Sequence, residues 1–426
     1  MNAAAYPPLK REARRLVLAG LLGLSLAARA APELSVPIDL PAASAVEAAL
    51  MTHPAVQAAQ ARVASAQAEG RHLNAGTHEY QASAGYTRRR ESGIGNMNDW
   101  EIGVERGLRL PGKARLDRQI GDTVVAAAEE RVGDARHETA RDLLATWYAA
   151  LRAQAEAQSW REQAALLKQQ REVVEKRIKA GDAARMERAQ ADAALRQAEA
   201  ETRRGETAAA EAGAHLVARF PGLPPPVVKA GESPRLSGSA TEWVAAALEH
   251  NHELAILNRE AERMRIQARR QQADLIPDPS IGLRFSRERD GQDNLLGLSL
   301  TLPLPGEGRR ALVDRASREA VALAREEAAA RARIEGEIRV LHARVRGTLN
   351  RLESLEEMAG QLEGYADLAW RAYQMGETPL WEALNARRSA RDAHREVLLS
   401  RLDVHEAAAR LLLDSHGLWP LQEGHH

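Results

Sequence analysis

The chain has 426 residues, with 59 basic and 59 acidic side chains and no cysteine. The lack of cysteine excludes disulfides, thiolate metal sites, a cysteine nucleophile and a lipidated cysteine, and the zero formal charge argues against bulk nucleic-acid binding. Aromatic residues make up only 4% of the chain, while Ala, Glu, Leu and Arg are abundant, which is typical of long helices or coiled coils.

Residues 1–30 have the pattern of a secretory signal peptide. Four basic residues precede the apolar run 16–28, and the tripeptide Ala-Arg-Ala at 28–30 fits a small-x-small cleavage site. The apolar run is too short to span a bilayer. The alternative is a buried helix. We expect an exported, non-lipidated mature chain.

The mature sequence repeats itself at an offset of about 195 residues. LRLPGKAR (108–115) matches LPLPGEGRR (302–310), and the stretch 177–201 matches 372–396. A segment rich in Pro, Gly and Ser separates the copies and is typical of a linker. The predicted units are a first repeat (31–220), a linker (221–240), a second repeat (241–416) and a C-terminal tail (417–426).

Each copy is predicted to contain a helix, a strand pair, a very long helix, a Gly-containing break and a final helix. The predicted helices are 46–77, 113–178 and 184–218 in the first copy and 241–275, 308–374 and 379–414 in the second. From Ile334 to Leu362 the apolar residues alternate in steps of four and three, as in a coiled coil. At 1.5 Å per residue the first long helix would reach about 100 Å, so the two shorter helices of a copy can stack end to end beside it.

Alternating apolar and polar residues predict four strands, at about 79–89, 99–110, 279–288 and 294–304. Polar, Gly-containing segments within each pair indicate hairpins. The strand lengths suit tilted transmembrane β-strands, although a soluble antiparallel sheet packed on a helix would show the same alternation. The charged residues assigned to the polar side, and hence to a barrel lumen, are Glu101, Glu105, Arg109 and Arg284.

Four strands are too few to close a membrane barrel, and open strand edges in lipid leave backbone groups unpaired. If the strands span a membrane, several chains must therefore share one barrel. Three chains would give twelve strands, and the helices would continue from that barrel as a tube.

The two Leu-Pro-Gly runs are predicted to be joints between a strand and a long helix. Proline has no N–H and ends the strand ladder, and glycine gives the backbone freedom to turn. The cationic side chains that follow, such as Lys113, are expected to snorkel at the membrane edge. The joint residues are Pro111, Gly112, Pro305 and Gly306.

This ordered duplication resembles the TolC family of outer-membrane efflux proteins over essentially the whole mature chain. The stretches that carry the resemblance are the helix start at His53-Pro54, LRLPGKAR, LLATWYAALRA (143–153), RIKAGDAAR, FPGL, LPLPGEGRR and AYQMGETPLWEALNARRSARDA. GDARHETARDLLATWY and RIKAGDAARMERAQADAAL are most similar to the CzcC-like heavy-metal branch. The resemblance implies a mainly α fold with a small β part, in which a trimeric twelve-stranded barrel is continued by an α-helical coiled-coil periplasmic tunnel.

The resemblance also implies a function. The chain would be the outer-membrane channel of a tripartite efflux system and would passively conduct heavy-metal cations from the periplasm to the exterior. Its implied partners are two further copies of itself, a periplasmic adaptor (membrane fusion protein), an inner-membrane pump of the resistance-nodulation-division type and outer-membrane lipid. No enzyme activity, cofactor or nucleic acid is expected. The alternatives are a channel for drugs or type I protein secretion, and a periplasmic coiled-coil scaffold.

Two groups of residues are assigned to the tunnel tip. Arg177, Gly181, Tyr373 and Gly376 surround the Gly breaks and are candidates for docking the adaptor, with both glycines in positive-φ helix-hairpin turns; the alternative for the glycines is a purely structural turn. Glu187 and Glu382 would recur around the tunnel mouth of a trimer as an acidic gate that selects cations, or else lie on a solvated helix face.

The thirteen histidines show no i, i+4 pair with an acid of the kind that marks a metal site, so none is predicted. His250 and His252 flank Asn251 within a predicted helix, and His425 and His426 end the sequence given.

Overall fold

The computed structural model describes residues 32–229 and 231–419. The predicted signal peptide, His425 and His426 lie outside the described residues. No helix in the described ranges is long and apolar enough to cross a membrane.

The described chain consists of two halves with the same order of elements and the same helix lengths of 10, 22, 69 and 35 residues. The duplication is therefore also a structural one. The first half contains α1 (Ala43–Thr52), α2 (Pro54–Ala75), β1 (Tyr80–Glu91), β2 (Gly95–Gly107), α3 (Pro111–Lys179) and α4 (Arg185–Arg219). The second contains α5 (Ala240–Glu249), α6 (His252–Ala273), β3 (Ser280–Glu288), the short 3-10 helix η1 (Arg289–Gly291), β4 (Asp293–Thr301), α7 (Glu307–Met375) and α8 (Leu380–Asp414).

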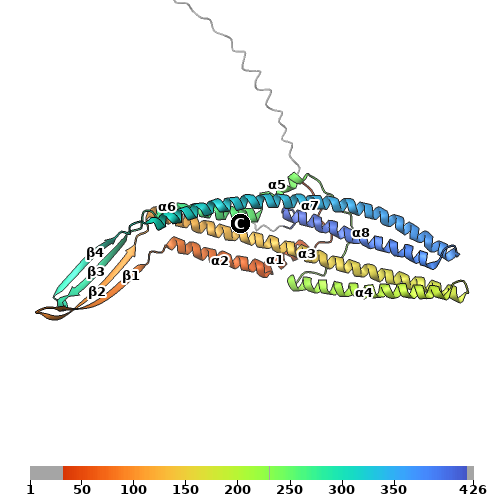
Figure 1. Cartoon of the computed structure of the whole chain (residues 1–426), viewed down its shortest axis with the longest axis horizontal. Coiled ribbons are helices and arrows are strands. Elements are labelled where there is room, and N and C mark those ends of the chain that lie inside the picture. Colours follow the sequence, from red (N-terminus) through yellow and green to blue (C-terminus); the bar gives the residue numbers. More distant parts are fainter. Residues whose placement is uncertain (1–31, 230, 420–426) are drawn as a thin grey trace, which may run out of the picture.

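The molecule is a rod with the sheet at one end and two helix-hairpin tips at the other (Figure 1). In the first half α2 and α4 follow one another alongside α3, and in the second half α6 and α8 do so alongside α7. Contacts of α3 with α6 and α8 join the halves. The end-to-end stacking predicted from helix lengths is confirmed, and a 69-residue helix corresponds to about 100 Å.

The first helix predicted in each repeat is in fact two helices. The predictions of one continuous helix at 46–77 and at 241–275 were therefore wrong. In the first half His53 is extended (ψ 133°) because the following Pro54 disfavours the helical conformation of the residue before it. In the second half Asn251 caps α6, and its side-chain oxygen accepts a hydrogen bond from the Leu254 N–H (3.0 Å). His250, Asn251 and His252 therefore lie at a helix junction and not within one helix.

The predicted coiled-coil seam of α7 is confirmed. Positions seven residues apart are buried along the helix, while the alternate positions between them are mostly half-buried. This is the heptad pattern of a helix that packs along one narrow face. The buried series is Ile338, Val345, Leu352, Ala359, Ala366 and Tyr373.

Small residues bring the helices of each pair close together. A Cβ added at Gly121 of α3 would lie 3.0 Å from the Gly70 Cα of α2, and a Cβ added at Gly205 of α4 would lie 3.0 Å from the Ala157 Cα of α3. Because these neighbours are backbone atoms, the close approach requires glycine. The paired helices can therefore run side by side over the whole length of α3.

The four strands form one antiparallel sheet in the order β1-β2-β3-β4, and the β2–β3 pairing joins the two repeats. The predicted strand bounds needed correction. β2 begins at Gly95 and not at 99, because polar residues before 99 also belong to the strand. One of them, Asn98, donates its backbone N–H to Asp290 Oδ1 (2.8 Å). β2 ends at Gly107 and β4 at Thr301, three residues earlier than predicted in both cases, and in β4 Pro303, which has no N–H, follows closely.

The segment that precedes α1 is anchored in the core by a buried acid. Asp39 is 2% exposed. One oxygen of its carboxylate accepts a hydrogen bond from Tyr148 Oη (3.0 Å), and the other lies 3.0 Å from His405 Nδ1. Its backbone carbonyl accepts a third hydrogen bond, from Trp147 Nε1 (2.9 Å). Burial and the neighbouring carboxylate raise the pKa of Tyr148. This network joins the N-terminal segment to α3 and α8.

We expect Asp39→Ala to lower the free energy of unfolding by about 3 kcal/mol, since it leaves the buried partners of a charged group unpaired. The measurement is the midpoint of chemical unfolding, followed by tryptophan fluorescence in detergent. Glu33→Ala is the matched control: Glu33 is exposed in the same segment, so a change within about 0.5 kcal/mol is expected. Equal midpoints for the two variants would contradict this role of Asp39.

Candidate functional site

The two hairpin tips have the same backbone geometry. Gly181 and Gly376 both have φ of +80°, which confirms the predicted positive-φ turns. At the first tip the Asp182 N–H donates to the Arg177 carbonyl (2.9 Å), and at the second the Glu377 N–H donates to the Ala372 carbonyl (2.9 Å). These are the bonds of a Schellman-type helix end, in which glycine takes the left-handed position.

Arg177 connects the two tips. Its Nη1 donates to the Tyr373 carbonyl (2.6 Å), and its Nε donates to Asp182 Oδ2 (3.0 Å). Its guanidinium carbon also lies 4.5 Å from the centre of the Tyr373 ring, within the range of a cation–π contact. The structure therefore brings together Arg177 of the first half and Tyr373 of the second, which the family resemblance assigned to one site.

Tyr373 extends this network to Glu187. The tyrosine is 2% exposed, and its hydroxyl donates to Glu187 Oε2 (2.7 Å). Burial, followed by the hydrogen bond to Glu187, raises the pKa of Tyr373 to about 12. The phenol therefore stays protonated at physiological pH and acts as a hydrogen-bond donor between the two hairpins.

Glu187 and Glu382 occupy the same position in α4 and α8, the third residue of each helix. A carboxylate there is favoured by the helix dipole. Both side chains are half-buried and both accept hydrogen bonds, Glu187 from Tyr373 and Glu382 from Thr378 Oγ1 (2.9 Å). In a single chain they thus take part in tip contacts, and the acidic gate remains a prediction.

Apolar side chains are exposed next to the tip turns. Met186 and Trp381, the second residues of α4 and α8, are 68% and 58% exposed, and Met375 at the end of α7 is 68% exposed. Sequence reasoning missed this surface because single methionines and tryptophans in a helix have no distinctive pattern. The turn residues predicted to dock an adaptor hold the tip together, and these three side chains are free to contact a partner.

One face of the sheet is apolar over its central rows, with Arg88, Arg90 and Arg287 at its hairpin end. The strand register aligns Ala84 with Ile102, Ile102 with Phe285, and Phe285 with Leu296 across all four strands. Most of this face is exposed, with Leu298 at 79%. Arg106 interrupts the apolar pattern, and its side chain points to the helical end of the face. Its guanidinium carbon lies 4.5 Å from the centre of the Tyr80 ring, and its Nε donates to the His78 carbonyl (3.2 Å).

The opposite face of the sheet is polar and carries three of the four predicted lumen charges. Arg284 Nη1 lies 3.5 Å from Glu101 Oε2, and Glu105 lies on the same face, opposite Gly282. The prediction for Arg109 was wrong. Arg109 lies beyond the end of β2 and donates to the Leu73 carbonyl (2.7 Å) at the end of α2, because the strand stops at Gly107.

The joint between β2 and α3 contains a buried ionic network that the sequence did not reveal. Lys113 is 2% exposed, and its Nζ lies 2.9 Å from both Asp274 Oδ1 and Asp278 Oδ1 and donates to the Ile276 carbonyl (2.7 Å). The pKa of Asp274 is lowered, because hydrogen bonds from Arg270 and Lys113 outweigh its partial burial. Lys113 therefore fixes the joint to the segment after α6 and does not snorkel as predicted.

The role predicted for the joint glycines was also wrong. Pro111 is the first residue of α3, where its fixed φ suits the helix, so Gly112 lies in the first helical turn. In the second half, Pro305 precedes α7 and Gly306 is its N-cap, with φ −114° and ψ −179°. Neither glycine has a positive φ. The joints lie where the sequence placed them, but the chain passes from strand to helix through residues in the extended conformation, such as Leu110 and Gly306.

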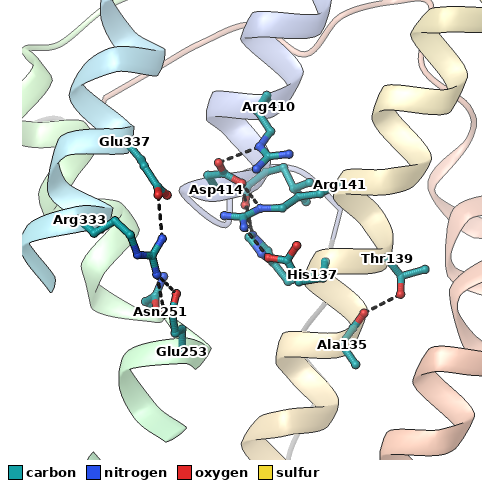
Figure 2. A network of polar contacts seen from close by, with 12 residues as sticks. Ala135, His137, Thr139, Arg141, Asn251, Glu253, Arg333, Glu337, Arg410 and Asp414 are labelled. Atoms are coloured by element: carbon teal, nitrogen blue, oxygen red, sulfur yellow. Dashed lines mark hydrogen bonds and ion pairs between the residues drawn. The ribbon is translucent and has the colours of Figure 1, made fainter. Parts of the chain in front are cut away.

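A polar cluster lies midway along the rod, where α3, α6 and α7 meet the end of α8 (Figure 2). Asp414 accepts hydrogen bonds from Arg141 Nε (2.8 Å) and Arg410 Nε (2.9 Å), and its Oδ1 lies 3.7 Å from His137 Nε2. Burial and the nearby Arg141 lower the pKa of His137 to about 4. Burial and the neighbouring histidines lower that of His416 to about 4 as well.

The fold is that of outer-membrane channel subunits. VceC from Vibrio cholerae matches with a TM-score of 0.70 at 19% identity, over 89% of this chain and 99% of that one. CmeC, an outer membrane channel from Campylobacter jejuni, matches with a TM-score of 0.70 at 15% identity, over 89% and 86%. CusC, described as forming a transmembrane channel, matches with a TM-score of 0.71 at 14% identity, over 91% and 99%.

Residues 243–413 match the family model for outer membrane efflux proteins. The match covers most of the second repeat, and the first repeat has the same helix lengths in the same order. No curated protein gives a significant match. The resemblance in fold to TolC-like outer-membrane channels is confirmed. The similarity to the CzcC-like branch remains a prediction.

We expect Gly181→Ala and Gly376→Ala each to lower the free energy of unfolding by about 1–2 kcal/mol, because an L-residue is strained at φ near +80°. An added Cβ at either position meets no atom within 4 Å, so only backbone strain is measured. Gly347→Ala in α7 is the matched control: its Cβ also meets nothing, and a helical alanine should stabilise by about 0.5–1 kcal/mol. Chemical unfolding compares the three variants, and equal effects would contradict the turn geometry.

Proposed function

We propose that this protein is the outer-membrane channel of a tripartite efflux system, which conducts its substrate passively from the periplasm to the exterior. The observation that carries the proposal is a sheet with one exposed apolar face and two unpaired edges at the end of a paired-helix rod. The family match and the structural similarities support it.

The exposed apolar face of the sheet fits a lipid environment. Large contiguous apolar surfaces are rare on soluble monomers, and the strands, of 9 to 13 residues, are long enough to cross a bilayer at a tilt. Tyr80 lies toward the helical end of the face, and Tyr86 and Trp100 lie toward the hairpin end. Aromatic residues at both borders are characteristic of membrane barrels.

The sheet edges call for further copies of the chain. The edge strands β1 and β4 expose one row of backbone groups each, and neither stretch 80–87 nor 294–301 contains a charged side chain that would prevent pairing. Lipid cannot satisfy these groups. Three copies, each pairing its β4 with the β1 of the next, would form a closed antiparallel barrel of twelve strands, and the homotrimer is part of this proposal.

The polar face of the sheet would then line the lumen of the barrel. Its carboxylates outnumber its guanidinium groups: against Arg89 and Arg284 the strand register places Glu91, Asp99, Glu101, Glu105, Glu288 and Asp293. An acidic lining favours cations. This charge supports heavy-metal cations as the substrate class, as does the resemblance to the CzcC-like branch. Drugs or secreted proteins are the competing substrates.

The opposite end of the rod would meet the other two components. The exposed side chains of Met186, Met375 and Trp381 offer an apolar contact surface beside the two glycine turns. We propose that a periplasmic adaptor docks there and connects the channel to an inner-membrane pump of the resistance-nodulation-division type. Arg177 and Tyr373 would support this surface by fixing one hairpin to the other.

The membrane orientation is tested by two adjacent residues of β4. Leu298 lies on the apolar face and Ser299 on the polar face. We expect Leu298→Lys to reduce trimer in the outer-membrane fraction severalfold, because a cation facing lipid near the bilayer midplane costs about 2–4 kcal/mol. Ser299→Lys should leave assembly near the level of the unmodified protein. Density-gradient fractionation measures the amount in the outer membrane, and native mass spectrometry measures the amount of trimer. If the unmodified protein is recovered as a soluble monomer, the proposal is overturned in favour of a periplasmic scaffold.

The substrate class is tested with a deletion strain. Growth across a series of Zn²⁺, Co²⁺, Cd²⁺ and Cu²⁺ concentrations is compared with growth across a series of drugs. We expect the deletion strain to be sensitive to metal cations. The intact gene should restore its growth in their presence, and a Leu298→Lys copy should not. Drug sensitivity without metal sensitivity would be consistent with the proposed channel function but would contradict the proposal that its substrates are metal cations.

A further inference from the structure

Four histidines from three separate segments meet near the end of α8. His137 lies in α3, His250 and His252 flank the junction of α5 and α6, and His416 is the second residue after α8. The ring centre of His416 lies 5.4 Å from that of His137, 5.8 Å from that of His252 and 6.1 Å from that of His250. The efflux function uses none of these side chains.

Two of the imidazoles have one nitrogen fixed as a donor. His137 Nε2 lies 3.2 Å from the Leu413 carbonyl and His252 Nδ1 lies 3.2 Å from Glu130 Oε2. A carbonyl or carboxylate only accepts, so these nitrogens carry protons, and the other nitrogen of each ring is the one that could bind a metal ion. Histidines that bind metals have this arrangement, with the second N–H held by a carbonyl or carboxylate.

The backbone makes room for the cluster. A Cβ at Gly133 of α3 would lie 2.4 Å from His252 Cε1, so the imidazole packs where any other residue would place a side chain. His416 has a φ of +58°, and the Gly417 N–H beside it donates to the Leu412 carbonyl (2.8 Å). The end of α8 is thus turned so that His416 faces the other rings.

The ring separations are close to those of histidines that share a metal ion. With Zn–N distances of about 2.0–2.1 Å and tetrahedral geometry, two bound imidazoles have ring centres about 5 Å apart. In the present conformation no three His, Asp or Glu side chains in the described ranges are arranged to hold a metal ion. Each pair that includes His416 must therefore close by about 0.5–1 Å. His137 and His252 each contact His416 but have no ring contact with one another, so binding also requires the half-buried His252 and His416 side chains to rotate and bring these two rings together.

We propose that this cluster is a binding site for one divalent transition-metal ion such as Zn²⁺, with His137, His252 and His416 as ligands and the exposed His250 at its rim. Imidazole nitrogen suits such ions. The bound ion would join α3, the α5–α6 junction and the end of α8, and would be a resident of the protein and not its transported substrate. The proposal is independent of the channel function.

The test is Zn²⁺ binding to the purified full-length protein in detergent, measured by competition with a chromophoric chelator after metal removal. We expect one tight site that is lost in His416→Ala and in His252→Ala. Two control variants should keep it: His215→Ala, which removes an exposed histidine of α4, and the double variant His425→Ala/His426→Ala, which removes the terminal pair.

A second set of measurements separates ligand loss from misfolding. Glu130→Gln keeps every histidine and replaces the carboxylate that accepts the His252 N–H with a neutral amide, a weaker acceptor, so it should weaken Zn²⁺ binding by about 10–100-fold. Co²⁺ should give the intense visible absorption of a tetrahedral site with the unmodified protein and not with His416→Ala. Circular dichroism checks that each variant is folded. The proposal is overturned if the unmodified protein takes up no Zn²⁺, if the terminal double variant alone loses it, or if His416→Ala and Glu130→Gln both bind as tightly as the unmodified protein.

Discussion

The backbone hydrogen bonds at the two edges of the sheet are the constraint on which the rest of the structure depends. The described part of each chain provides four strands, and in the lipid environment that we propose their edge groups have no solvent partner. Closure with other copies of the chain satisfies them without any additional element. Since β1 and β4 run in opposite directions, the edge of one copy can pair with the opposite edge of the next as an antiparallel ladder. In the channel that we propose, the sheet thus calls for a ring of copies before any helix contact is considered.

The helical part is built so that it can continue such a ring. Glycine and alanine bring α2 and α4 close to α3, as at Gly121 and Gly205, and the resulting layer is thin and long. A ring of such layers leaves an open centre, whereas helices packed through large side chains would form a solid core. The large buried side chains, including Trp147, Tyr148 and Trp243, gather midway along the rod, where α1, α5 and the segment before α1 cover α3, α7 and α8. The rod is therefore thickest near its middle.

The sequence predicted much of this architecture because duplication, helix periodicity and strand alternation are local patterns. The long helices were placed to within two residues, and Gly181 and Gly376 were correctly assigned positive φ because only a turn explains glycine between two long helical stretches. The errors have local causes as well. The break at His53 follows from Pro54, and the early start of β2 follows from polar residues that lack an apolar alternation.

The contacts between distant segments could not be predicted. Asp39 and His405 are separated by 366 residues, and nothing in either neighbourhood distinguishes them from surface residues. The same holds for Lys113 with Asp274 and for the four histidines around His416. Their sequence positions carry no periodic signal, because a single polar contact requires only that two side chains meet in space. At the tip, Arg177 and Tyr373 were assigned to one site from the resemblance and not from a residue pattern.

The two repeats have the same geometry but different chemistry at their joints, and this difference has a structural consequence. The first joint is enclosed within the chain, where Lys113 is buried between Asp274 and Asp278. The second joint has no such enclosure: Leu304 is 88% exposed, and Arg309 donates to the Asp274 carbonyl (2.8 Å). In the closed ring that we propose, the second joint lies at the boundary between copies, where the end of α2 of the next chain takes the place that α6 occupies at the first joint. Duplication then explains how one chain can present both an internal and an intermolecular version of the same contact, with buried ions in the contact that forms on folding and exposed leucine in the contact that forms on assembly.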